Sequence, residues 1–287
     1  MMRLPHKKSI VTAIFIFLLP LIAFSQAFML EDWPADRARI TFKYLHPNLT
    51  HIINQNDLSF YSGVYYLSFN FPVKGNPRLN LEAALPFLVN HLKSEPVYGK
   101  QREAMIGSLY LGYQYKLKSK SPKKGTTLSA GVYLGTTPDN KYDTYFMALN
   151  TNFIGFAGFQ AHDLVPTLNI ASYRELGHFR IGWEAGPAML FETENAGYMD
   201  PILYFHYGVF GSFRTAYVTF RVELAGFMVV AGEKDHLNMS PDTNTVAVGA
   251  HFGRGRFIPG VFYKKCLVAK NRREVKDVLG FQIQWLL

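Results

Sequence analysis

The last eleven residues, Asp277 to Leu287, most constrain what this chain can fold into. From Leu279 onward, large apolar side chains occupy every second position: Leu279, Phe281, Ile283, Trp285 and Leu287. A period of two predicts a β-strand with one apolar face. We expect no later segment to cover this strand, and an uncovered apolar strand edge promotes aggregation. A closed barrel in a bilayer solves both problems, because lipid covers the apolar face and the first strand pairs with the edge.

This ending resembles the C-terminal assembly signal of bacterial outer-membrane β-barrels, in which apolar residues alternate and an aromatic residue lies at or near the end. Trp285 stands two positions before Leu287, which holds the place usually taken by Phe. The resemblance implies an assembly role for Gly280, Phe281, Ile283, Trp285 and Leu287. It also implies the barrel-assembly machinery, outer-membrane lipid and lipopolysaccharide as partners.

Residues 1–25 have the pattern of a secretory signal peptide. Arg3, Lys7 and Lys8 precede an apolar run from Ile10 to Phe24, and Ala23-Phe24-Ser25 is a small-x-small cleavage site. The alternative, an uncleaved anchor helix, is disfavoured because the run is short and contains Pro20. Residues 26–37 show no period and form an irregular lead-in. We therefore expect export and, with the barrel, location in the bacterial outer membrane.

Composition agrees with a barrel better than with a helical membrane protein. Of the 287 residues, 48% are hydrophobic, yet the mean hydropathy is −0.00, as expected when only every second strand residue faces lipid. The formal charge is +9, or about +6 once the three leader cations are removed. No basic run with interleaved aromatics indicates nucleic-acid binding. The single Cys266 excludes an internal disulfide.

Alternation along residues 38–287 predicts one transmembrane antiparallel up-and-down β-barrel, with fourteen strands as the best count and twelve as the alternative. The region 142–175 decides between them: we interpret it as three short strands, although two long strands with an irregular join also fit. The expected strands lie near 38–46, 58–71, 78–90, 103–117, 126–136, 142–150, 152–160, 164–174, 179–191, 201–211, 215–230, 244–253, 257–264 and 277–287.

The links between these strands tend to alternate between long and short. Long links lie near 47–57, 90–103, 192–200, 231–243 and 265–275, and short ones near 72–77, 118–125, 150–152, 175–177, 212–214 and 253–256. Outer-membrane barrels have short periplasmic turns and longer outer loops, so we expect both chain ends to be periplasmic. A β-sandwich would also repeat short strands, but several expected strands exceed its usual strand length.

The face opposite the apolar one carries polar residues and charges of both signs. The candidates to line a lumen are Arg78, Glu82, Arg180, Glu184, Tyr204, His206, Arg221 and Glu223. Arg180 and Glu184, like Arg221 and Glu223, lie an even number of residues apart on one strand, so each pair points the same way. These residues either bind or screen a polar solute, as charged rings do in pores, or pair across strands to fill a narrow interior.

The function predicted best is a pore or transporter that passes small solutes across the outer membrane, with a mild preference for anions. The alternative is a structural or surface-binding barrel with a side-chain-filled lumen, and an outer-membrane lipid hydrolase is less favoured. We expect no enzyme, because no His has Ser two residues later, and G-x-S-x-G, H-E-x-x-H and P-loop motifs are absent. Asp235-His236 matches a protease dyad only weakly. We expect neither a metal nor another cofactor.

Overall fold

The computed structural model describes residues 37–49, 59–91, 102–137, 151, 157–159, 163–192, 201–232, 242–253, 255–267 and 275–287. The expected leader and nearly all of the lead-in lie outside these ranges and stay predictions, and residues 142–150 also lie outside them. Within them, no helix has the length and apolar character needed to cross a membrane.

Thirteen strands make up the described part of the chain, and all their pairings are antiparallel. They are β1 (Arg39–Leu49), β2 (Gly63–Val73), β3 (Asn76–His91), β4 (Arg102–Ile106), β5 (Leu109–Lys116), β6 (Lys124–Leu134), β7 (Asp163–Leu176), β8 (Phe179–Glu192), β9 (Ile202–Arg214), β10 (Val218–Ala231), β11 (Asp242–Phe252), β12 (Phe257–Cys266) and β13 (Val275–Leu286).

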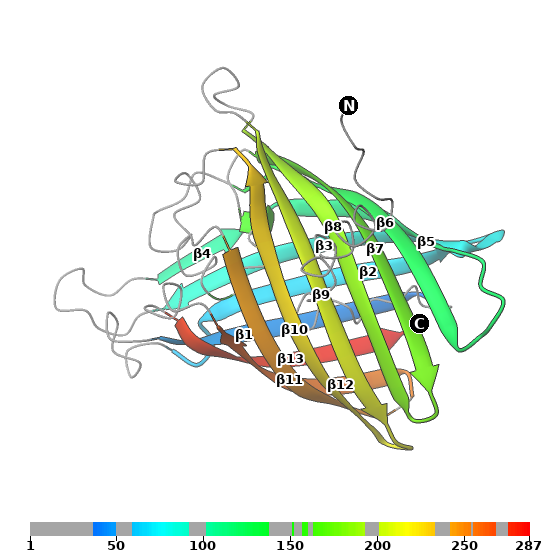
Figure 1. Cartoon of the computed structure of the whole chain (residues 1–287). Coiled ribbons are helices and arrows are strands. Elements are labelled where there is room, and N and C mark those ends of the chain that lie inside the picture. The colour runs from blue at the N-terminus through cyan, green and yellow to red at the C-terminus, as the bar shows by residue number, and fades with distance from the viewer. Residues whose placement is uncertain are drawn as a thin grey trace, which may run out of the picture.

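Twelve of these strands close into a barrel (Figure 1). Each pairs with its neighbours in chain order, and β1 pairs with the final strand β13 over eleven residue pairs, from Arg39–Leu286 to Leu49–Val275. The terminal apolar strand is thus covered by the first one, as its alternation predicts. The result is an all-β antiparallel barrel of the outer-membrane type.

The short strand β4 lies beside β3 on the same side as β5, so it does not add a thirteenth strand to the barrel wall. Both pair with β3, but five residues of β3, from Leu88 to Ala84, lie opposite six residues from Met105 to Tyr110. Gly107 and Ser108 therefore form a β-bulge, which shifts the alternation by one residue. Unbroken alternation along the strand expected at 103–117 would place Met105 on the lipid face with Leu111 and Tyr113, but beyond the bulge Met105 is buried and Ile106 is exposed.

The preferred count of fourteen strands was wrong, and the alternative of twelve is confirmed. The two additional strands were those expected at 142–150 and 152–160. In the structure β6 pairs directly with β7, from Leu134–Leu164 to Lys124–Arg174, so no strand lies between them. Residues 157–159 form a single short turn of 3₁₀ helix with buried side chains.

The outer surface carries a belt of large apolar side chains that no part of the described chain covers. It includes Leu81, Leu111, Leu128, Leu168, Ile181, Trp183, Phe220, Val222, Val248, Val261, Leu279 and Phe281. A water-exposed belt of this size would be unstable, whereas lipid matches it. Phe179, Phe213, Tyr217, Phe257 and Trp285 are exposed near the tight turns, where barrels place an aromatic girdle. This is a protein of the bacterial outer membrane.

The tight turns share one end of the barrel with the start of β1 and the end of β13 (Figure 1). Two of them contain only two residues, Lys74-Gly75 and Gly177-His178. Gly75 and Gly177 have φ values of 88° and 65°, a conformation that residues other than glycine disfavour. This conformation lets so short a link reverse the chain. We call this the turn end and the opposite one the loop end.

Replacing Leu128 by Lys tests the assignment of faces. Leu128 is exposed near the middle of β6, so the charge would enter lipid and lower the free energy of unfolding by about 2–4 kcal/mol. Its neighbour Ser129 lines an internal cavity that also contains Glu82 and Glu184, so Ser129→Lys should cost much less. Urea unfolding in lipid vesicles, followed by tryptophan fluorescence, measures both. Equal losses would contradict the assigned faces.

Candidate functional site

The inward-facing side chains change character along the barrel axis. Near the loop end, β1, β2 and β3 turn Leu45, Val64 and Leu88 inward, and each is at most 3% exposed. Nearer the turn end, the inward positions of the same strands hold polar residues such as Arg39, Asn70 and Asn80, which are also buried. The lumen therefore has an apolar zone toward the loops and a polar zone toward the turns.

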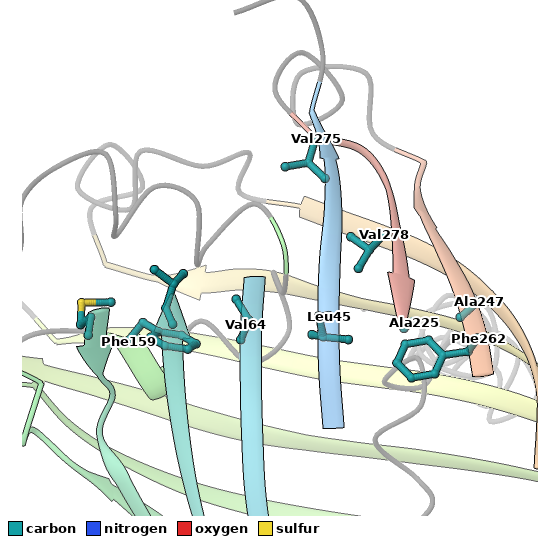
Figure 2. Close-up of a cluster of buried hydrophobic side chains, with 10 residues drawn as sticks. Leu45, Val64, Phe159, Ala225, Ala247, Phe262, Val275 and Val278 are labelled. Carbon is teal, nitrogen blue, oxygen red and sulfur yellow. The ribbon is translucent and has the colours of Figure 1, made fainter. Parts of the chain in front are cut away.

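Residues 157–159 lie inside the apolar zone. Phe159 is fully buried, and its ring meets Tyr66 edge-on with the centroids 6.3 Å apart. The carbonyl of Gly158 accepts a hydrogen bond from the backbone N–H of Ser108 (2.7 Å), which fastens the segment to the β-bulge. Figure 2 shows Phe159 near the strands that carry Val64 and Leu45.

We call the buried side chains around this segment the apolar layer. Its members come from nearly every strand at the loop end, and Ala157 and Phe159 join them from the middle: Leu45, Val64, Leu88, Met105, Val165, Ala188, Leu190, Ile202, Tyr204, Ala225, Phe227, Val229, Ala247, Phe262, Cys266, Val275 and Val278. This layer narrows the lumen on its loop side.

Below the apolar layer lies a central cavity of about 210 Å³. One wall is a hydrogen-bond network across β2, β3 and β5. The Gln114 side-chain amide donates to Glu82 Oε1 (2.5 Å), Asn70 donates to the same oxygen (3.2 Å), and Asn80 donates to Asn70 Oδ1 (2.7 Å). On the opposite wall Asn169 donates to Glu184 Oε2 (3.3 Å). Both carboxylates are thus held by amide donors in fixed positions.

At the turn end the lumen widens into a second cavity of about 910 Å³, which we call the basic vestibule. Its charged lining residues are Arg39, Lys116, Lys120, Lys124, Arg180, Arg214 and Arg221, with His251 beside them. Arg39 and Thr127 line both cavities, so the vestibule and the central cavity are adjacent.

Two vestibule arginines are held by carboxylates and by aromatic rings. Arg221 forms an ion pair with Glu223, which is 1% exposed, and its guanidinium lies 4.4 Å from the centre of the Phe210 ring. Arg180 pairs with Glu175 across the β7–β8 hairpin and lies 4.7 Å from the centre of the Tyr173 ring. Such cation–π contacts and ion pairs fix long side chains that would otherwise be mobile.

The structure separates the eight lumen candidates into groups. Glu82, Glu184, Tyr204 and His206 line the central cavity, and Arg180 and Arg221 line the vestibule. Glu223 is buried against Arg221. Arg78 is exposed at the turn end and is absent from both linings.

Sequence reasoning missed three contributors to the lumen. It assigned residues 152–160 to a strand, and it gave no lumen role to Arg214 or to Lys120 in the β5–β6 link. Arg214 lies an even number of residues from Tyr204 and His206 on β9 and so points inward as they do. Alternation alone could have found it. No pattern indicates that Lys120, in a turn, bends over the lumen.

The residues of the C-terminal signal divide between the two faces. Phe281, Trp285 and Leu287 are exposed on the outer face of the barrel end. Gly280 faces inward, where the Phe262 ring packs so closely that a Cβ would displace the ring. Their role in assembly stays a prediction. Among the described residues, no group of three or more His, Cys, Asp or Glu is placed to hold a metal ion.

Removing Arg221 should destabilise the barrel strongly. The Arg221→Met variant leaves the buried Glu223 carboxylate without this ion-pair partner, and breaking such a pair costs about 3–5 kcal/mol. The double variant Arg221→Met/Glu223→Leu should recover most of that loss, because it removes both charges. Urea unfolding measures all three proteins. A single variant as stable as the parent would show that the pair is not a buried interaction.

No protein-family model matches the chain, and no curated protein sequence matches it. Its fold is similar to that of solved outer-membrane barrels. With the COG4313 outer membrane channel from Pseudomonas putida F1 the TM-score is 0.63 at 13% identity, covering 89% of this chain and 97% of that one. With the KdgM porin the TM-score is 0.51 at 6% identity, covering 87% and 99%. At such low identity the likeness shows a shared barrel fold.

Proposed function

We propose that this protein is an outer-membrane channel for small solutes. The observation that carries the proposal is the continuous polar zone of the lumen, in which the central cavity adjoins the basic vestibule. Two solved barrels of similar fold are described as an outer membrane channel and as a porin, which supports the proposal. The proposal gives the chain no catalytic role.

The size of the central cavity argues against a lumen filled by side chains alone. One buried water needs about 10–15 Å³ of cavity volume, so the central cavity of about 210 Å³ can hold many waters. The walls of the cavity offer amide, hydroxyl and carboxylate groups that can hydrogen-bond to water or to a polar solute. A barrel that served only to anchor outer loops would need no polar space of this kind.

The apolar layer acts as the gate in this proposal. Hydrophobic constrictions close pores by excluding water without a complete steric block. Phe159 is suited to this role because it projects from the 157–159 segment rather than from the barrel wall. A movement of that segment would widen the lumen while the β-barrel stays intact.

Planar-bilayer recording of the purified barrel tests the channel. The parent should give a small, steady conductance, and Phe159→Ala should raise it because the apolar layer loses a buried ring. Phe220→Ala is the matched control, since Phe220 is exposed on the lipid face, and should leave the conductance unchanged. Heat-dependent gel mobility would show that each variant is folded. Silence from folded parent and Phe159→Ala barrels alike would contradict the channel.

A further inference from the structure

We propose that the basic vestibule binds small solutes bearing two or more negative charges on phosphate or carboxylate groups. The inference deepens the proposed channel function by naming its solute class. It concerns binding at the turn end of the lumen, however, and binding can be measured without any current.

The charge of the vestibule lining has a single sign. Seven Lys or Arg residues line it, and none of the described lining residues is Asp or Glu. Glu175 and Glu223 offset two of the seven through their pairs with Arg180 and Arg221. The other two lumen carboxylates that we have described, Glu82 and Glu184, line the central cavity. The vestibule therefore keeps a clear positive excess.

The cations surround the cavity instead of forming one stripe. Arg39 comes from β1, Lys116 from β5, Arg180 from β8, Arg214 from β9 and Arg221 from β10. A cleft of one charge sign between low-dielectric walls concentrates the field and raises the local concentration of counter-ions. A solute with several negative charges gains from contacts on several sides at once.

Neutral donors accompany the cations. Ser119, Ser121, Thr126, Ser212, Thr219 and Gln284 also line the vestibule. Arginine guanidinium groups bind carboxylate and phosphate through paired N–H donors, and lysine supplies a point charge. About 910 Å³ is within the usual range for a small-molecule site. The chemistry and the size both fit a small oxyanion.

The turn end also carries cations that lie outside the vestibule lining, and these residues can serve as a matched control for the vestibule cations. Lys74, Lys118 and Arg174 are exposed at this end and do not line the cavity. By contrast, Arg39 and Arg221 in the lining are no more than 9% exposed. Burying charge is costly, and an anion in the vestibule would offset part of that cost.

Equilibrium dialysis of the folded barrel in a neutral detergent tests the site, with pyrophosphate and citrate as separate probes. The parent should retain at least one of them in a saturable way that weakens with added NaCl. Pyrophosphate retention would identify phosphate groups as ligands, and citrate retention would identify carboxylates. The vestibule variant Lys116→Ser/Lys120→Ser/Arg214→Ser should lose most of the binding.

The variant Lys74→Ser/Lys118→Ser/Arg174→Ser removes the same charge from the same end and should bind like the parent. Equal loss in both triple variants, or no retention of either probe by the parent, would overturn the vestibule site. Retention by the parent, with both the parent and Phe159→Ala silent in bilayers, would refute the channel and leave the site standing. A conducting parent that retains neither probe would refute the vestibule site and leave the channel standing.

Discussion

The pairing of β1 with β13 is the interaction on which the rest of the structure depends. It joins the two ends of a twelve-strand sheet, so each of the twelve barrel strands pairs on both sides within the same chain. In a bilayer, backbone groups left without partners cost several kcal/mol each, and closure removes that cost. Closure also separates an outer face that suits lipid from an inner face that is free to be polar. The central cavity and the vestibule exist only because of that separation.

The lumen combines two kinds of stabilisation. Toward the loops, the apolar layer packs around Phe159 as the core of a soluble protein would. Toward the turns, buried charges are held by amides, by opposite charges and by aromatic rings, as in the Gln114–Glu82 bond and the Arg221–Glu223 pair. Such pairs stabilise little relative to an apolar core. Their retention in the lumen is understandable if a polar path is needed there, as a channel requires.

Much of this fold follows from period-two alternation, because each barrel strand has one lipid face. The faces of Leu279, Phe281 and Trp285 were predicted correctly for that reason. Alternation fails where a residue is inserted, as at the Gly107-Ser108 bulge, which turned Met105 inward. It also fails where an apolar residue packs inside the barrel: Phe159 looks like a lipid-facing residue in sequence. The vestibule could be predicted only in part. Alternation indicates which side chains of one strand point inward, but it does not indicate that Lys116, Arg180 and Arg214 line the same cavity, because that depends on how the barrel closes.

Disulfide trapping of the closing pair measures the central claim directly. In a Cys266→Ser background, Thr41→Cys and Gln284→Cys place two thiols on directly opposed residues of β1 and β13, both facing inward. Directly opposed strand residues have Cβ atoms about 4.5–5.5 Å apart, so mild oxidation of the membrane-embedded protein should cross-link them and shift the mobility of the heat-unfolded chain. The pair Thr41→Cys with Gln282→Cys is displaced by two residues and should cross-link poorly. Cross-linking in the displaced pair but not in the opposed one would contradict closure in this register.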